Sequence, residues 1–304
     1  MRVSWWAVAG AAAIMTGCNH EPGSTVLTRG DLTLACDEAV YSAFVNEVGE
    51  FQTYYPEAKL KLRKVEAREA VSLFGADSVR VIVTARELNQ GERTALKNAK
   101  IPLDEYKVAL SAVAVIVHPG NPLKRIRMTE LDSIFSGTVT RWPERGGIIE
   151  AVAAGRNSST NEAFKNAILQ GHEFGPTIDY VDSSEARLER VAKTPNAIAL
   201  ISVNWLKEKE QSVRALEVGG PSYRPDTTAA AGQYYAPWQA YVFLGHYPIV
   251  TPVYMYSREE RQDVALGIIA YVCSAPGQKI VQNHGLVPVT MPVRLVSLTS
   301  EQVH

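Results

Sequence analysis

The chain has 304 residues, of which 46% are hydrophobic, and its 31 basic and 32 acidic side chains leave a formal net charge of -1 at pH 7. Charges of both signs are interspersed, so the composition gives no reason to expect a nucleic-acid partner. The length suits one large domain or two of medium size.

The first 18 residues have the pattern of a secretory signal. Arg2 is basic, residues 5–14 are apolar, and the run closes with the letters MTGC, ending at Cys18. The apolar run is too short to be a comfortable membrane span, which favours a signal peptide.

The MTGC ending resembles a bacterial lipobox, with methionine in place of the usual leucine. We therefore expect residues 1–18 to be a lipoprotein signal peptide that ends at a lipidated Cys18. The mature chain would then lie on the periplasmic side of the cell envelope, anchored to a membrane by its lipid. Residues 19–29 are polar with Pro and Gly, as a tether would be. The alternative is an ordinary signal peptide with an incidental cysteine.

Short apolar runs alternate with helical patterns along the rest of the chain, which predicts an α/β architecture. The expected strands cover residues 32–36, 79–84, 108–118, 148–154 and 197–203. The expected helices cover residues 40–51, 129–135, 183–193 and 261–274, with one more after the capping pattern of Asn89 and Glu92. Residues 239–256 and 285–298 are expected to be β-type or extended, and residues 219–237 a loop or linker.

The segment RNSSTNE, residues 156–162, stands between a predicted strand and a predicted helix. Ser159 and Glu162 fit a capping box, which places the helix start at Ser159. The first amides of a helix lack partners within it and favour an anion. Neighbouring hydroxyls can donate to oxyanion oxygens, so the segment suits a tetrahedral anion. The alternative is that Ser and Thr only cap this helix.

Motifs for catalysis and metal binding are absent from the sequence. There is no HExxH, GxSxG, GxxxxGK[ST] or CxxC pattern, and the histidines after residue 100 are scattered singly. We therefore expect no enzyme activity, no cofactor and no metal. Cys36 and Cys273 either pair after export or stay as buried thiols, and the sequence leaves both open.

One segment resembles a family signature. Residues 129–142, TELDSIFSGTVTRW, are similar to the "LT...L..IFSGK.T.W" pattern of phosphate-binding proteins that serve ABC-type phosphate transporters. Other pieces resemble that family in the same order along the chain. They are the loop at residues 83–88, the NSST loop at residues 157–160, residues 191–201, Tyr247-Pro248 and residues 285–289.

The resemblance implies a type II periplasmic binding protein fold, with two α/β domains, a central ligand cleft and two crossing segments. Domain I would comprise residues 30–112 plus 240–304, and domain II residues 113–239. The implied function is an extracytoplasmic lipoprotein that captures inorganic phosphate and delivers it to the permease subunits of an ABC importer, acting as a monomer. A binding protein or sensor for another oxyanion is the alternative, and an envelope phosphohydrolase is the least favoured.

Helix starts from both domains would face one anion in this arrangement. The phosphate-binding residues that the resemblance implies are Asp37, Glu38, Thr84, Arg86, Arg156, Ser158, Ser159 and Thr160. We expect Asp37 to cap the first helix, Glu38 to accept the proton of hydrogen phosphate, and Arg86 to balance the ligand's charge.

Three departures from the family pattern concern this site. Many members carry an arginine and an aspartate at the positions of Ala154 and Arg156, and some carry an aspartate at the position of Arg86. The glycine-rich first loop is replaced by residues 35–39, ACDEA. These departures are why another oxyanion remains a candidate ligand.

Overall fold

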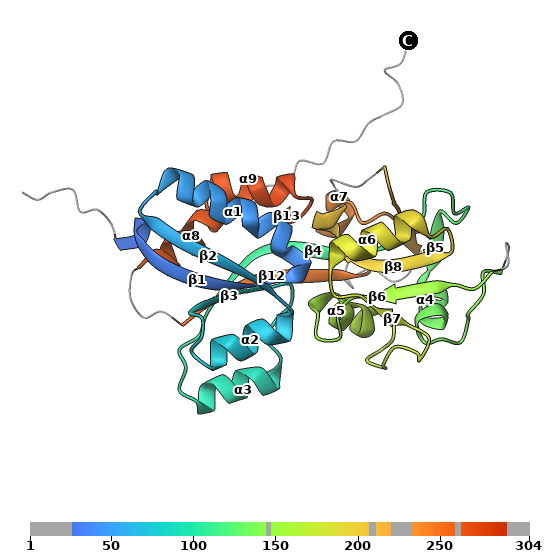
Figure 1. The fold of residues 1–304 in the computed structure, drawn as a ribbon, viewed down its shortest axis with the longest axis horizontal. Helices are drawn as coiled ribbons and strands as arrows, with labels where there is room; N and C mark the ends of the chain where they lie inside the picture. The colour runs from blue at the N-terminus through green and yellow to red at the C-terminus, as the bar shows by residue number, and fades with distance from the viewer. Residues whose placement is uncertain (1–25, 144–146, 207–210, 220–232, 259–262, 291–304) are drawn as a thin grey trace, which may run out of the picture.

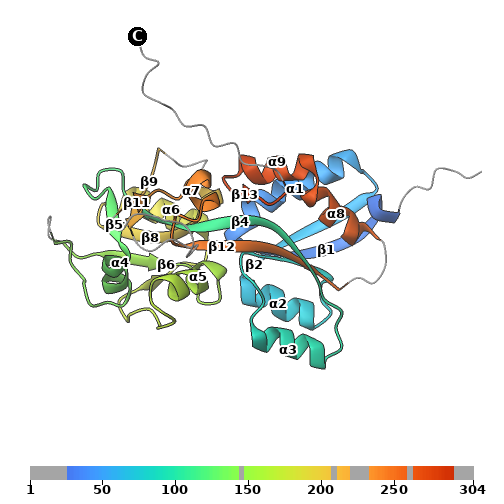
Figure 2. The same ribbon diagram turned by 180° about the vertical axis from the view of Figure 1, so that it is seen from behind.

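The computed structural model describes residues 26–143, 147–206, 211–219, 233–258 and 263–290. These form two lobes placed side by side, with two long strands running from one into the other (Figure 1). The two strands are β4 (Asp104–Val117) and β12 (Val250–Ser257), and the view from behind shows the same crossing (Figure 2).

The first lobe is built on three parallel strands next to β12. These are β1 (Gly30–Asp37), β2 (Ala58–Val65) and β3 (Val81–Thr84). One face of this sheet carries α1 (Tyr41–Tyr54), α8 (Val264–Cys273) and α9 (Ala275–Asn283), and the other carries α2 (Ala67–Gly75) and α3 (Gln90–Asn98) (Figures 1 and 2). The short pieces are η1 (Val26–Thr28), η2 (Glu38–Val40) and β13 (Val287–Pro288).

The second lobe continues the same sheet. Its strands are β6 (Glu150–Ala153), β7 (Asp179–Tyr180), β8 (Ala197–Ser202) and β9 (Arg214–Ala215), and its helices are α4 (Met128–Phe135), α5 (Ser159–Ala167) and α6 (Ser184–Lys193). A small separate sheet contains β5 (Arg125–Arg127), β10 (Glu217–Gly219) and β11 (Tyr234–Tyr235). The remaining elements are η3 (Val203–Trp205) and α7 (Gln239–Phe243).

Strand β4 changes partners where it passes between the lobes. The main path of the sheet runs β2-β1-β3-β12-β4-β8-β6-β7. Ala112 pairs with Val250 of β12, whereas Val113 pairs with Ser202 of β8. The exchange falls between residues 112 and 113. The division into domains of residues 30–112 plus 240–304 and residues 113–239 stays a prediction.

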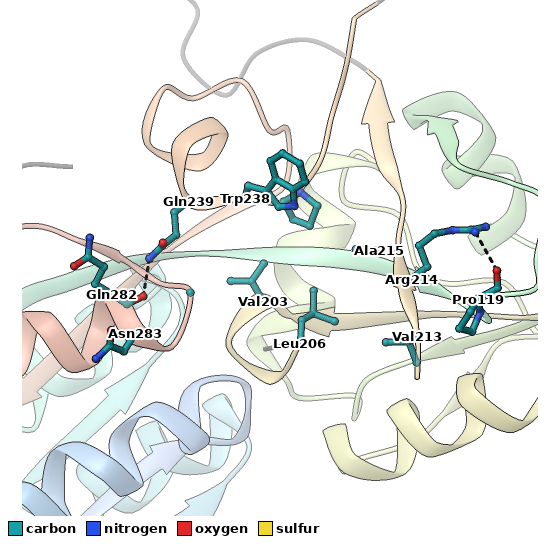
Figure 3. A pocket seen from close by; sticks show the side chains of 12 residues that line it. Pro119, Val203, Leu206, Val213, Arg214, Ala215, Trp238, Gln239, Gln282 and Asn283 are labelled. Atoms are coloured by element: carbon teal, nitrogen blue, oxygen red, sulfur yellow. Dashed lines mark hydrogen bonds between the residues drawn. The ribbon is translucent and has the colours of Figure 1, made fainter. Parts of the chain in front are cut away.

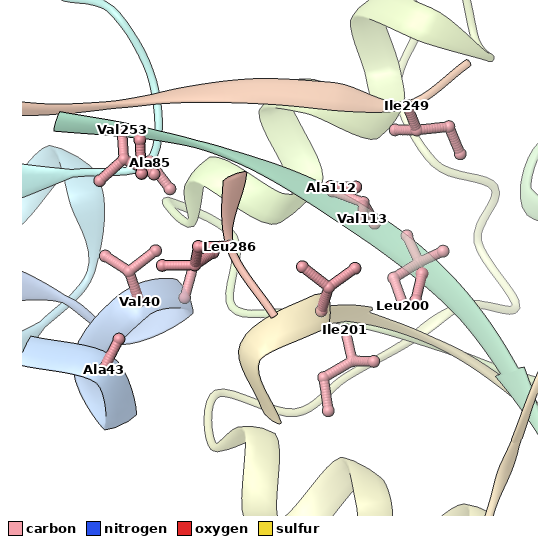
Figure 4. Close-up of a cluster of buried hydrophobic side chains, with 14 of the residues drawn as sticks. Val40, Ala43, Ala85, Ala112, Val113, Leu200, Ile201, Ile249, Val253 and Leu286 are labelled. Atoms are coloured by element: carbon pink, nitrogen blue, oxygen red, sulfur yellow. The ribbon is translucent and has the colours of Figure 1, made fainter. Parts of the chain in front are cut away.

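Buried apolar side chains fill the junction around this exchange (Figure 4). Ala112, Val113 and Ile201 are almost completely buried there, together with Val40 and Leu286 of the first lobe. Burial of apolar surface at about 25 cal/mol per Å² makes such a cluster stabilising. The two lobes therefore share one continuous apolar core at the crossing strands.

Most of the predicted elements occur; one predicted segment is wrong, one is described only in part, and some elements were not predicted. The helix after Asn89 begins with the predicted capping box, Asn89 with Glu92. Residues 239–243, expected to be β-type, form α7, because the β pattern begins only at Val250. Strand β2 and helices α2 and α9 were not predicted from the sequence. Residues 285–298 were expected to be extended. Strand β13 lies within that segment, and residues 291–298 lie outside the described part of the chain.

The two cysteines of the described chain do not pair. Cys36 is buried and Cys273 is half-buried, and both are free thiols. Burial raises the pKa of the Cys36 thiol well above its usual value. Among the described residues, no single helix has the length and apolar character of a membrane span; α8 and α9 pass that test only as a pair bent by 64°. Cys18, the predicted lipidation site, and the tether up to residue 25 lie outside the described residues.

Candidate functional site

Three strands end at the boundary between the lobes, and predicted site residues lie at or just after the end of each strand. Asp37 ends β1, Thr84 ends β3, and RNSST follows β6. The Asp37 carboxylate accepts hydrogen bonds from the amides of Ala39 at 3.1 Å and Ala85 at 3.0 Å. Ends of parallel strands in open α/β sheets are where ligands bind. We call the group formed by Asp37, Arg86, Ser158, Ser159 and Thr160 the interlobe site.

The anion loop before α5 is held by its own hydrogen bonds. Helix α5 begins at Ser159, as predicted, but the cap is Ser158, whose hydroxyl accepts from the Asn161 amide at 3.2 Å. The Asn161 side chain donates to the carbonyls of Ala154 and Gly155, at 2.8 and 2.9 Å, and accepts from the Ala154 amide. Asn161 was missed in the sequence, and it fixes the loop's shape.

The hydroxyls of Ser159 and Thr160 lie at the start of α5 and are buried, with residue exposures of 0% and 2%. Thr160 Oγ1 has no hydrogen-bond partner within the described part of the chain. Ser159 Oγ makes no hydrogen bond of normal geometry there, but it lies close enough to the Asp37 carboxylate to lower the pKa of that group. Leaving a buried hydroxyl unsatisfied costs about 1 to 3 kcal/mol, so native structures give such groups a partner. Together with the first amides of α5, these hydroxyls are suited to an oxyanion.

Asp37 lies on the opposite side of this site, in the first lobe. It is fully buried, and burial raises the pKa of its carboxyl group to about 6, while the nearby Ser159 hydroxyl and the amides of Ala85 and Ala39 act in the opposite direction. The carboxylate also caps η2 through Ala39, as predicted for the start of the first helix. At neutral pH it remains an acceptor beside the donors of α5.

Arg86 bridges the lobes but is largely engaged by carboxylates. Its terminal nitrogens donate to the two Glu92 carboxylate oxygens at 2.7 and 2.6 Å, and its Nε lies 3.4 Å from Glu162 of α5. That Nε is buried and makes no hydrogen bond within the described residues. The Thr84 hydroxyl donates to the Arg86 carbonyl at 2.8 Å, so Thr84 shapes the loop that carries Arg86.

Two further predicted site residues have other contacts. Glu38 is buried, and its carboxylate oxygens accept from the Ser184 amide at 2.7 Å and from Arg187 at 3.2 Å, both in the second lobe. Arg156 is exposed, and its guanidinium carbon lies 3.9 Å from the centre of the Tyr180 ring, as in a cation–π pair. Their roles in ligand binding stay predictions.

Glu66, which precedes α2, also approaches the anion loop and was missed in the sequence. Its Oε1 is buried without a hydrogen-bond partner among the described residues. Burial raises the pKa of Glu66, Asn157 opposes that rise through hydrogen bonds, and Asp182 adds to it. The Arg68 amide donates to the Asn157 carbonyl at 3.3 Å, so the start of α2 touches the second lobe's loop directly.

A cavity of 770 Å³ lies elsewhere, between the second lobe and the segment of α7 and α9 (Figure 3). Val203, Leu206 and Trp238 line it, and Gln239 donates to the Gln282 carbonyl at its edge. Arg214, a charged residue of the described lining, donates to backbone carbonyls. This lining does not resemble an anion site. Within the described ranges, no three His, Cys, Asp or Glu side chains are grouped so that they could hold a metal ion.

Comparison with known proteins places this arrangement in a family. The PBP superfamily domain model matches residues 22–276, so the chain belongs to the PBP superfamily. The two-lobed α/β structure with crossing strands is the type II periplasmic binding fold, as predicted.

Three curated relatives and several similar solved structures are named as phosphate-binding proteins. The phosphate-binding protein PstS of Bacillus subtilis is 26% identical over 265 residues, covering 86% of this chain and 81% of that protein. PstS of Pseudomonas aeruginosa is 21% identical and covers 87% and 84%. A putative phosphate ABC transporter substrate-binding protein from Clostridium perfringens, solved with bound phosphate, superposes with a TM-score of 0.74 at 21% identity, covering 86% of this chain and 100% of that one.

Proposed function

We propose that this chain captures a small tetrahedral oxyanion, inorganic phosphate in the first place, in the interlobe site and delivers it to the permease subunits of an ABC importer. The observation that carries the proposal is the pair of buried hydroxyls at the start of α5. Thr160 has no hydrogen-bond partner within the described residues, and Ser159 faces the Asp37 carboxylate without a hydrogen bond of normal geometry. The names of the relatives support phosphate and transport as the first choice.

The residues around the site have separate roles in this proposal. Ser158, Ser159 and Thr160 donate hydroxyl hydrogens, and the first amides of α5 donate along the helix dipole. The buried Nε of Arg86 adds a charged donor. No cofactor or metal takes part, and no catalytic group is needed, because the ligand is held and released unchanged.

Asp37 is the better candidate for the proton acceptor. Glu38 is the acceptor expected from the sequence, but its carboxylate oxygens already accept from Ser184 and Arg187. The Asp37 carboxylate lies near Ser159, and with a pKa of about 6 it is mostly ionised at neutral pH. It can then accept the proton of hydrogen phosphate, whereas sulfate has no proton to share and meets repulsion.

We further propose that the protein works outside the cytoplasm as a monomer tethered by a lipid on Cys18. The support is the MTGC ending of the signal-like segment. Changing Cys18 to Ser is expected to give protein that is exported but released from membranes, because the acyl chains and not the fold hold it there. Membrane association of the variant equal to wild type would contradict the anchor.

Another oxyanion, or a sensing role on the same scaffold, is the second candidate. It is favoured by the charge balance of the site: Ala154 stands where many family members have arginine. The two terminal nitrogens of Arg86 moreover donate to the Glu92 carboxylate, and its Nε is paired with Glu162. The site therefore offers few free positive groups for a dianion.

A calorimetric titration with phosphate, arsenate and sulfate separates these candidates. The proposal predicts one site that binds phosphate and arsenate and discriminates against sulfate. Preference for sulfate would move the assignment to the second candidate, and absence of binding to all three would contradict oxyanion capture. Turnover of a chromogenic phosphate ester at sub-stoichiometric protein would instead indicate a phosphohydrolase.

A further inference from the structure

Glu38 follows Asp37 in the first lobe, yet its carboxylate is bound by the second lobe. Oε1 accepts from the Ser184 amide at 2.7 Å, and Oε2 accepts from the Ser184 hydroxyl at 3.1 Å and from Arg187 Nη2 at 3.2 Å. Glu38 is 7% exposed and Arg187 is 0% exposed. This is a buried, charge-assisted contact between the lobes.

The second lobe holds its half of this contact in place. Ser183 caps α6 by accepting from the Ala186 amide, so the Ser184 amide lies in the first turn and is directed out of the helix. Arg187 donates to the carbonyls of Val181 and Asp182 and to the Ser184 hydroxyl. A helix start with a fixed guanidinium is a favourable position for a carboxylate.

Neighbouring contacts join the same parts of the two lobes. The Trp205 indole donates to the Glu38 carbonyl at 3.2 Å, and Asn204 donates to the Ser42 hydroxyl at 2.7 Å. The apolar core continues across the crossing strands, which connect the two lobes there. Any opening that separates η2 from α6 must therefore break the bonds of Glu38.

We propose that Glu38 and Arg187 form an interlobe latch, two positioning residues that hold the lobes together beside the interlobe site without contacting the ligand. The inference rests on the proposed function in one respect, namely that the bound oxyanion is enclosed between the lobes. The latch favours the closed arrangement before ligand binds, so it raises the apparent affinity by raising the fraction of binding-competent protein.

The test compares Glu38→Gln with wild type in small-angle scattering and in stopped-flow release of inorganic phosphate. The amide keeps the side chain's shape but removes the charge and one acceptor. We expect the variant without phosphate to have a larger radius of gyration than wild type and to contract more when phosphate is added. Phosphate should leave it about tenfold faster, the effect of losing one hydrogen bond to a charged group.

The matched control is Glu185→Gln, on the next residue of α6. Glu185 also crosses between the lobes, pairing with Lys64 at 3.3 Å, but both side chains are substantially exposed. Exposed pairs contribute little, so this variant should match wild type in both measurements.

Two outcomes would overturn the latch, and a third would overturn only the proposed function. An unchanged radius of gyration in Glu38→Gln, even with a lower melting temperature, would overturn the latch and leave a purely local stabilising contact. Equal contraction of wild type and variant on phosphate addition would overturn it too. If wild type binds no phosphate, the proposed function fails, and the ligand-free radii of the two proteins still test the latch.

Discussion

Glu66 Oε1 occupies the space that any side chain at position 155 would need. A Cβ atom built on Gly155 lies 1.8 Å from that oxygen and 2.9 Å from an Asp182 oxygen. Glu66 belongs to the first lobe and Gly155 to the anion loop of the second. Glycine therefore permits the close approach of the two lobes at this point.

Replacement of Gly155 by alanine tests that relationship. The added methyl group must displace the Glu66 carboxylate, so we expect phosphate affinity to fall by about 1 to 2 kcal/mol, a factor of about 5 to 30. Calorimetry of Gly155→Ala measures this loss. The double variant with Glu66→Ala removes the obstructing oxygen and should recover most of the affinity. Failure of the second change to restore binding would show that Glu66 is not the main obstacle, which leaves the Asp182 oxygen or the loop itself.

Two substitutions at Ser159 separate ligand binding from helix capping. Ser158 is the cap, so Ser159→Ala should leave α5 intact and cost about 1 to 3 kcal/mol in phosphate affinity through one lost donor. Ser159→Asp places a negative charge against the anion, at a cost of about 4 kcal/mol for charges roughly 4 Å apart near a protein surface. Titration calorimetry and circular dichroism report the two effects.

The control for this pair is Ser133→Ala, which removes a hydroxyl that donates to the Thr129 carbonyl within α4. Its phosphate affinity should equal that of wild type. Normal binding by both Ser159 variants would mean that the hydroxyls serve only the helix.

Asp37→Asn and Glu38→Gln decide which carboxylate takes the ligand's proton. If Asp37 is the acceptor, its amide variant should weaken phosphate and strengthen sulfate, because the amide can donate where the carboxylate only accepts. We expect the phosphate-to-sulfate affinity ratio to fall about tenfold or more in Asp37→Asn, the scale of one hydrogen bond to a charged group.

Glu38→Gln should weaken both anions alike under the latch proposal, which leaves their ratio unchanged. A ratio altered only by Glu38→Gln would restore the assignment made from the sequence. Asp37→Asn also alters the contacts of this side chain with the Ala39 and Ala85 amides, which affects the binding of both anions. The phosphate-to-sulfate affinity ratio cancels that common effect.

The buried carboxyl group of Glu47 on α1 should make the free energy of unfolding depend on pH. It is fully buried, neither carboxylate oxygen has a hydrogen-bond partner within the described residues, and burial, with a smaller effect of Glu50, raises its pKa from 4.5 to about 9. The folded protein thus keeps a proton that the unfolded chain releases above about pH 4.5. The contribution of this proton to the free energy of unfolding is complete below about pH 4.5. It is lost as the pH rises toward about 9, by at most about 1.4 kcal/mol per pH unit.

Glu47→Gln removes this titration and keeps the shape of the protonated side chain. Its free energy of unfolding should exceed that of wild type by an amount that grows between about pH 5 and about pH 8. Urea unfolding at several pH values measures the difference, with Glu57→Gln as the exposed control. A difference that is constant with pH would contradict a protonated Glu47.

The start of α5 could be predicted because its signals are local. Ser, Thr and Asn between a strand and an apolar helix face mark a helix start wherever they occur. The sequence pattern predicted Ser159 as the cap, whereas the structure has Ser158. Each serine is followed three positions later by a residue whose amide could donate to it, so the pattern does not distinguish the two. The fold followed from the order of family-like segments, such as TELDSIFSGTVTRW.

The partners of Glu38 could not be predicted, because Ser184 lies 146 positions away and only the docking of the lobes brings them together. By contrast, β2 left a signal that was overlooked. Leu60 and Leu62 alternate with lysines, which is the period of a half-buried strand. Glu47 could also have been noticed, since it shares the helix face of Phe44 and Phe51.

An oxyanion bound between the lobes at the start of α5 can be located in a crystal. Anomalous X-ray diffraction from crystals grown with arsenate tests this binding site directly, because arsenic marks the position of the anion. The account predicts one strong peak within hydrogen-bonding distance of Ser159 Oγ and Thr160 Oγ1, with Asp37 on its other side. A peak elsewhere, or no peak between the lobes in crystals that contain arsenate, would contradict it.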